Sequence, residues 1–289
     1  MSGQFFQRVV QKLFHSSKSR EAGGSPLLSY VDRTALLPRE ALLRLGTEYG
    51  GWIIPSDAGL TSDSVCYSAG AGEDISFDCA LVERFRCRVR IIDPTPRAIQ
   101  HFGSLEKAVK RGERFPINNS KEYFYTITAE NFERLQFLPF GLADQDAEFK
   151  FYLPQNRDHV SCSIANLQKT ENYFTARCFR LGSIMQQQGD DFIEMLKIDI
   201  EGAEYAVIKD MKATKLLPRL LLIEFDEAHT PLDDNAGTRI KQHIDMLAQA
   251  GMRCIAVEGS NATFLNETCV HAKPQWLSPG GKDDAISPK

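Results

Sequence analysis

Short apolar runs alternate with longer amphipathic stretches between residues 61 and 270. The runs predict buried strands, at residues 64–69, 89–92 and in later segments, and the stretch at 75–85 predicts a helix that follows the first strand. Because strands and helices take turns, we expect a doubly wound α/β fold, in which a mainly parallel sheet carries helices on both faces. Further strands are expected within residues 135–144, 147–154, 194–199 and 218–227.

The pattern changes near the C-terminus. A helix is expected at residues 238–251, and the apolar runs 252–259 and 261–267 then follow each other with almost nothing between them. Parallel strands need a long crossover connection, so a link this short predicts an antiparallel hairpin at the edge of the sheet.

The two ends of the chain differ from this central part. Residues 1–26 form a basic amphipathic segment and a linker, and residues 271–289 have the composition of a disordered tail. Residues 27–60 predict a short helical cap, since proline stands near the start and glycine at the end of a helical pattern at 38–46. The ligand-binding domain is expected at residues 61–270.

Charge and composition argue against some kinds of binding partner and cellular location. A formal net charge of −4 gives no general attraction to nucleic acid, and no apolar run is long enough for an integral membrane segment. The seven cysteines include no CxxC pair, which favours a reducing, cytoplasmic location. The basic N-terminal segment is expected to be a solvated tail; a targeting sequence or a weak contact with a membrane surface are alternatives.

Candidate binding residues stand where the predicted strands end, because ligands of doubly wound sheets bind at the carboxyl ends of the strands. The first strand leads from Ser68 into a turn with Gly70 and Gly72, two residues that let the backbone approach a ligand closely. Asp93 ends the second strand, just before Thr95, and a carboxylate there can accept hydrogen bonds from the two hydroxyls of a ribose. This predicts a cofactor that contains adenosine.

The turn itself distinguishes between cofactors. A dinucleotide site needs a third glycine, but Ile75 holds that position, and Glu73 and Asp74 would repel a pyrophosphate. S-adenosylmethionine, with its ammonium and sulfonium groups, suits acidic side chains better.

Several segments, in this order, resemble the FkbM family of S-adenosylmethionine-dependent methyltransferases. They are YSAGAGEDISFD, IIDPTP, FGLAD, HVSCSI and LKIDIEGAEYAVI, within residues 49–267. The resemblance implies a class I, Rossmann-like fold with a seven-stranded sheet, and methylation of a hydroxyl on a sugar or natural-product-like small molecule. It also implies that Leu142, Ala143 and Asp144 lie near the adenine. Ser68 and Asp74 depart from the acidic residue and the glycine that many members have there.

Asp199, at the end of a central strand, is the first candidate for orienting or deprotonating the acceptor. Glu201 and His159 are further catalytic candidates, although a helix N-terminus also favours Glu201, and His159 can be an ordinary loop residue. Glu224, Asp226 and His229 could hold a divalent metal together with Asp199, but the sequence favours a reaction without metal.

Two other classes of protein remain open at this stage. The chain can bind S-adenosylmethionine without catalysis, or it can be a nucleotide-linked oxidoreductase. The identity of the acceptor and the oligomeric state do not follow from the sequence.

Overall fold

The computed structural model describes residues 24–118, 120, 122–153 and 170–269. His159 and the rest of the HVSCSI segment, residues 1–23 of the N-terminal segment and the C-terminal tail lie outside these residues.

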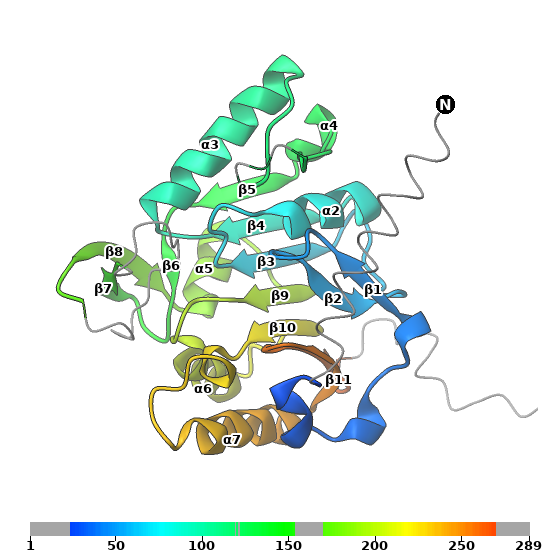
Figure 1. Cartoon of the computed structure of the whole chain (residues 1–289), viewed down its shortest axis with the longest axis vertical. Helices are drawn as coiled ribbons and strands as arrows, with labels where there is room; N and C mark the ends of the chain where they lie inside the picture. The colour runs from blue at the N-terminus through cyan, green and yellow to red at the C-terminus, as the bar shows by residue number, and fades with distance from the viewer. Residues whose placement is uncertain (1–23, 119, 121, 154–169, 270–289) are drawn as a thin grey trace, which may run out of the picture.

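The described residues form a seven-stranded main sheet with the strand order β11-β12-β10-β9-β3-β4-β5 (Figure 1). The five strands from β10 to β5 are parallel, whereas β12 runs antiparallel between β10 and β11. The doubly wound sheet and its terminal hairpin are therefore confirmed. The strands are β3 (Val65–Ala69), β4 (Arg88–Ile92), β5 (Leu135–Leu138), β9 (Met195–Ile198), β10 (Leu220–Glu224), β11 (Met252–Glu258) and β12 (Asn261–Asn266).

Helices cover both faces of this sheet because alternate side chains of its strands point to opposite sides. In β3, Val65, Tyr67 and Ala69 belong to one core cluster and Cys66 to the other. The first cluster packs against α5 (Leu181–Gln188), α6 (Glu204–Thr214) and α7 (Ala236–Gln249). The second packs against α2 (Ser76–Phe85), α3 (Pro96–Arg111) and α4 (Ala129–Phe132).

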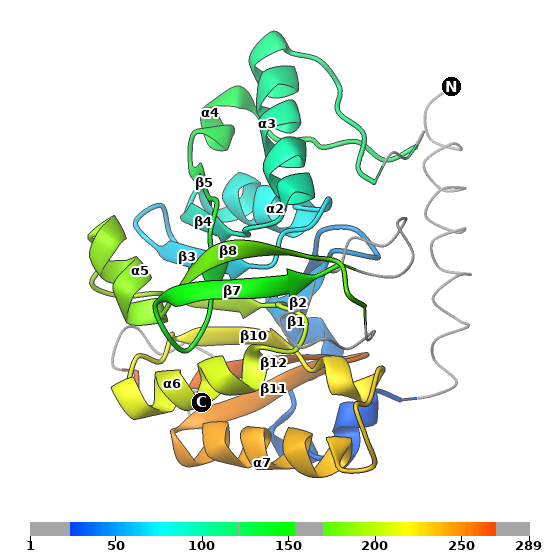
Figure 2. The ribbon, with the colours of Figure 1, turned by 90° about the vertical axis from the view of Figure 1, so that its left-hand side faces the viewer.

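A second, three-stranded sheet lies at the carboxyl ends of the parallel strands (Figures 1 and 2). It consists of β6 (Gly141–Leu142), β7 (Ala147–Tyr152) and β8 (Tyr173–Phe179) in the order β6-β8-β7. The sequence predicts β7, whereas β8 is not among the strands expected from it. Exposed and partly buried residues alternate along β8, so no continuous apolar run marks it.

The N-terminal cap differs from the prediction. The expected helix at residues 38–46 is wrong: only Arg39–Ala41 forms a 3-10 turn, and β1 (Leu42–Leu45) pairs with β2 (Trp52–Pro55). Trp52 and Ile54 are buried in the core, and the Thr263 hydroxyl donates to the carbonyl of Ile53. Packing of this hairpin on the sheet thus outweighs the local preference for helix. Two more 3-10 turns precede it, Pro26–Ser29 and Arg33–Ala35.

Candidate active site

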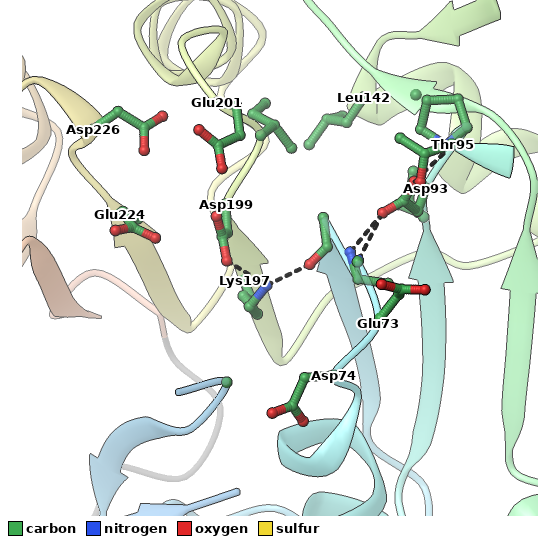
Figure 3. A pocket seen from close by; sticks show the side chains of 18 of the residues that line it. Glu73, Asp74, Asp93, Thr95, Leu142, Lys197, Asp199, Glu201, Glu224 and Asp226 are labelled. Atoms are coloured by element: carbon green, nitrogen blue, oxygen red, sulfur yellow. Dashed lines mark hydrogen bonds and ion pairs between the residues drawn. The ribbon is translucent and has the colours of Figure 1, made fainter. Parts of the chain in front are cut away.

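A cavity of about 320 Å³ lies at the carboxyl ends of β4, β3, β9 and β10. Leu142 and Phe151 of the second sheet line it from one side, and Tyr49 and Trp52 of the β1–β2 hairpin from another. Figure 3 shows its polar side chains, which run from Asp93 and Thr95 through Lys197 and Asp199 to Glu224 and Asp226.

The glycine turn after β3 packs directly on the end of β9. Gly70 has φ +83°, and a Cβ there would lie 1.6 Å from the carbonyl oxygen of Asp199. Gly72 also has a left-handed φ, +54°, and lines the cavity. Both positions require glycine, the first for a close backbone approach and both for their conformation.

Asp93 holds this turn in place. Its Oδ2 accepts from the backbone N–H groups of Ala71 (2.8 Å) and Gly72 (3.0 Å), and its Oδ1 accepts from the N–H (2.7 Å) and hydroxyl (2.6 Å) of Thr95. A carboxylate has about four acceptor sites, and protein donors occupy all of them. Asp93 lines the cavity, but a ribose hydroxyl would have to displace one of these donors. The ribose-binding role stays a prediction.

The acidic pair of the turn has partners in the protein. Asp74 accepts from the Thr47 hydroxyl (2.6 Å) and from the backbone N–H of Ser76 (2.9 Å) at the start of α2, and Glu73 pairs with Arg97. Both carboxylates still line the cavity. They provide negative charge on the side where the sequence predicts a cationic cofactor end.

Among the described residues that line the cavity, Lys197 is the only lysine or arginine. Only 5% of this residue is exposed. Its Nζ donates to the carbonyl of Gly70 (2.6 Å), lies 3.2 Å from Oδ2 of Asp199, and stands 5.3 Å from the centre of the Trp52 ring. The ammonium therefore fixes the position of Asp199 relative to the glycine turn.

Carboxyl groups crowd the end of the cavity near β10. Burial, and then the negative charge of Asp199, raise the pKa of Glu224 to about 8. Burial and the neighbouring carboxylates raise the pKa of Asp226 to about 11, and burial raises that of Glu204 to about 7. Glu201 adds another carboxylate from a turn where its φ is +54°, a conformation rarely taken by residues other than glycine. The crowding favours a cationic group in the cavity.

The structure brings most predicted site residues together. Ser68 is 1% exposed and lies beneath the turn, while Ala143 and the exposed Asp144 are outside the cavity wall. The predicted residues that line the cavity are Gly70, Gly72, Glu73, Asp74, Asp93, Thr95, Leu142, Asp199 and Glu201.

Sequence reasoning missed Lys197, Tyr49 and Trp52. A lysine inside an apolar strand was the available signal for Lys197, because lysine is almost never buried without a partner. Tyr49 and Trp52 belong to the hairpin that was taken for a helix and a turn.

The main sheet and the match to a family model identify a class I methyltransferase that uses S-adenosylmethionine. The chain belongs to the FkbM methyltransferase family, whose domain model, Methyltransferase FkbM domain, matches residues 71–254. The family resemblance, the cofactor and the class I fold are thereby confirmed, and the family does not support the oxidoreductase alternative. The residues present suit this cofactor, since Gly70 and Gly72 would permit a close approach to the turn and Glu73 and Asp74 give the cavity negative charge.

Distant similarity to solved structures accompanies the family match. Fibrillarin of Aeropyrum pernix, crystallised with S-adenosyl-L-methionine, shares 9% identity over 71% of this chain and 66% of its own, with a TM-score of 0.36. The precorrin-6y C5,15-methyltransferase of Geobacter metallireducens shares 10% identity over 71% of this chain and 79% of its own, with a TM-score of 0.31.

The chain thus spans just under two thirds of the fibrillarin. No curated protein sequence matches it. No helix among the described residues is long and apolar enough to cross a membrane.

Proposed function

We propose that the protein methylates a hydroxyl group of a small molecule such as a sugar or a natural-product-like metabolite. The observation that carries this proposal is the position of Asp199. Its carboxylate lines the cavity beside the glycine turn, and both Lys197 and the backbone contact with Gly70 hold it there.

When bound, S-adenosylmethionine supplies an electrophilic methyl group. Gly70, Gly72 and the acidic pair of the turn are the residues that would bind its methionine end, and Leu142 lies on the side expected for the adenine. Asp93 acts on binding through the turn that it organises.

Asp199 would accept a hydrogen bond from the acceptor hydroxyl and take its proton as transfer proceeds. A carboxylate fixed by an ammonium contributes through orientation as well as basicity, because a held geometry replaces a random encounter. Glu224 lines the same end of the cavity, and the charge of Asp199 helps to raise its pKa to about 8, after burial. Glu201 lines the same part of the cavity and is a second candidate for contact with the acceptor.

Tyr49 is suited to bind the apolar face of an acceptor ring. It is 74% exposed although it lines the cavity mouth, and a sugar or aromatic ring can pack on its face.

The test is incubation of the full chain with methyl-labelled S-adenosylmethionine and a panel of hydroxylated and amine-bearing small molecules, including free and linked sugars. We expect labelled O-methyl ethers, identified by mass spectrometry and NMR. Label that enters only amines would overturn the hydroxyl assignment. Cofactor binding in a calorimeter without turnover on any acceptor would instead favour a silent binding protein.

A further inference from the structure

We propose that Glu224, Asp226 and His229 form a binding site for a divalent cation, of the magnesium or manganese class, at the β10 end of the cavity. Glu224 ends β10, Asp226 begins the 3-10 turn Asp226–Ala228, and His229 directly follows that turn. All three line the cavity.

The separation of their ligand atoms suits a single ion. One ligand atom from each of the three side chains lies within 4.8 Å of the others. Atoms bound to the same ion are at most two bond lengths apart, about 4 to 5 Å for oxygen ligands of these cations. The side chains therefore need little movement to share an ion.

Asp226 supplies an independent indication of a missing ligand. The residue is 5% exposed, and its Oδ2 accepts no hydrogen bond from any donor among the described residues. Figure 3 shows its carboxylate directed into the space beside Glu201. A buried carboxyl oxygen that accepts no hydrogen bond has lost its hydration without replacement, and a bound cation would supply the missing contact.

Lys197, the only lysine or arginine among the described residues that line the cavity, does not neutralise the carboxyl groups at its β10 end. Lys197 Nζ is engaged by the Gly70 carbonyl and by Asp199, on the β3 side of the cavity. Near Glu224, the Ser260 hydroxyl donates to Oε1 (3.1 Å) and lies 3.2 Å from Nδ1 of His229. Ser260 therefore stands between two of the ligands and can orient them, as supporting residues of metal sites do.

The chemistry of the donors selects the class of cation. Two carboxylates favour magnesium, calcium or manganese, and the imidazole adds a ligand that manganese accepts more readily than calcium. A cation here would lie next to Asp199, where it could also hold the acceptor hydroxyl. That last contact rests on the proposed function, whereas binding of the cation does not.

The experiment titrates the full chain, without cofactor or acceptor, with Mn²⁺ and follows free Mn²⁺ by electron paramagnetic resonance. We expect one strong site per chain, from which Mg²⁺ displaces the probe. Asp226→Asn and His229→Ala should each weaken Mn²⁺ binding by at least roughly 10- to 100-fold. Loss of a residue that only supports a metal ligand has an effect of that size, and these variants remove a ligand itself.

Asp234→Asn is the matched control, because it removes one charge from an exposed residue close by in the chain. It should bind Mn²⁺ as the parent protein does. His229→Ala changes a half-exposed side chain and keeps the test valid if Asp226→Asn does not fold. Absence of a strong site in the parent, or equal binding by all variants, would overturn the proposal. Because no methyl transfer is measured, these outcomes are independent of the acceptor's identity.

Discussion

Gly70 and Asp199 touch through their backbones: a Cβ on Gly70 would lie 1.6 Å from the carbonyl oxygen of Asp199. The two residues directly follow β3 and β9, which are neighbours in the sheet. This contact holds the turn that faces the cofactor against the strand end that carries the proposed catalytic carboxylate. The geometry of the site therefore depends on the absence of a side chain at position 70.

Gly70→Ala should lower the free energy of unfolding by more than about 3 kcal/mol, above the common cost of overpacking, because backbone atoms must move apart. Urea denaturation measures the loss. The control is Gly112→Ala, since Gly112 also has a positive φ, +68°, but nothing lies within 4 Å of the added Cβ. Its expected cost is only the conformational strain, roughly 1–2 kcal/mol. Equal losses in the two variants would contradict the importance of the contact.

Asp93→Ala should weaken binding of S-adenosylmethionine by about 10- to 100-fold and also lower Tm, because four donors lose a charged acceptor. Calorimetry and thermal denaturation measure the two effects. Thr95→Val separates the roles of Asp93: it removes the hydroxyl that donates to Oδ1 and frees one acceptor position. If Asp93 binds the ribose directly, Thr95→Val should retain or improve the affinity. If Asp93 acts only through the turn, affinity should fall along with Tm.

The raised pKa of the buried Asp78 carboxyl should make the stability of the protein depend on pH. Burial raises its pKa from 3.8 to about 6, although the charge of Lys197 opposes this shift. The folded state therefore binds this proton more tightly than the unfolded state, so the contribution of Asp78 to stability declines as pH rises from about 4 to about 6. The shift corresponds to about 3 kcal/mol at neutral pH.

Asp78→Asn removes this charge while it keeps the shape of the side chain. We expect the variant to gain stability relative to the parent at neutral pH, and to lose that advantage in acid, as measured by thermal denaturation at several pH values. Asp63→Asn, at an exposed position, is the control. A stability difference between Asp78→Asn and the parent that stays constant with pH would show that the buried carboxyl does not titrate in this range.

Asp199→Asn should reduce kcat by about 10²- to 10⁴-fold, the usual contribution of a positioned acid or base, while the affinity for S-adenosylmethionine is retained. The amide keeps the size of the side chain and its position at the end of β9. Binding is measured by calorimetry and turnover with the acceptor found in the screen. Asp63→Asn, at an exposed position outside the cavity wall, should behave as the parent. Near-normal turnover of Asp199→Asn would exclude the catalytic role and direct the search to Glu201 and His159.

Much of this molecule follows from local patterns in the sequence. Apolar runs mark β3, β4, β9 and β10, and the helix after the glycine turn begins within one residue of its expected start. Strand ends carry Gly70, Asp93 and Asp199, so the topology alone brings them to one edge of the sheet. The family motifs in the same segments are what made the cofactor predictable.

Other features depend on contacts between distant parts of the chain, which no local pattern records. Leu42–Leu45 is a strand because it pairs with Trp52–Pro55 on the main sheet, although its own residues also suit a helix. The hydrogen bonds from Ala71 and Gly72 to Asp93, the approach of Lys197 to Gly70 and the Asp226 oxygen without a donor likewise arise from packing between elements. The sequence by itself determined the order along the chain of the main-sheet strands and the residues that follow their ends, because periodicity and turn chemistry act over a few neighbours. Only the tertiary structure decided which of those side chains are hydrogen-bonded by other parts of the protein and which face the cavity. Burial and hydrogen bonding depend on atoms that folding brings together.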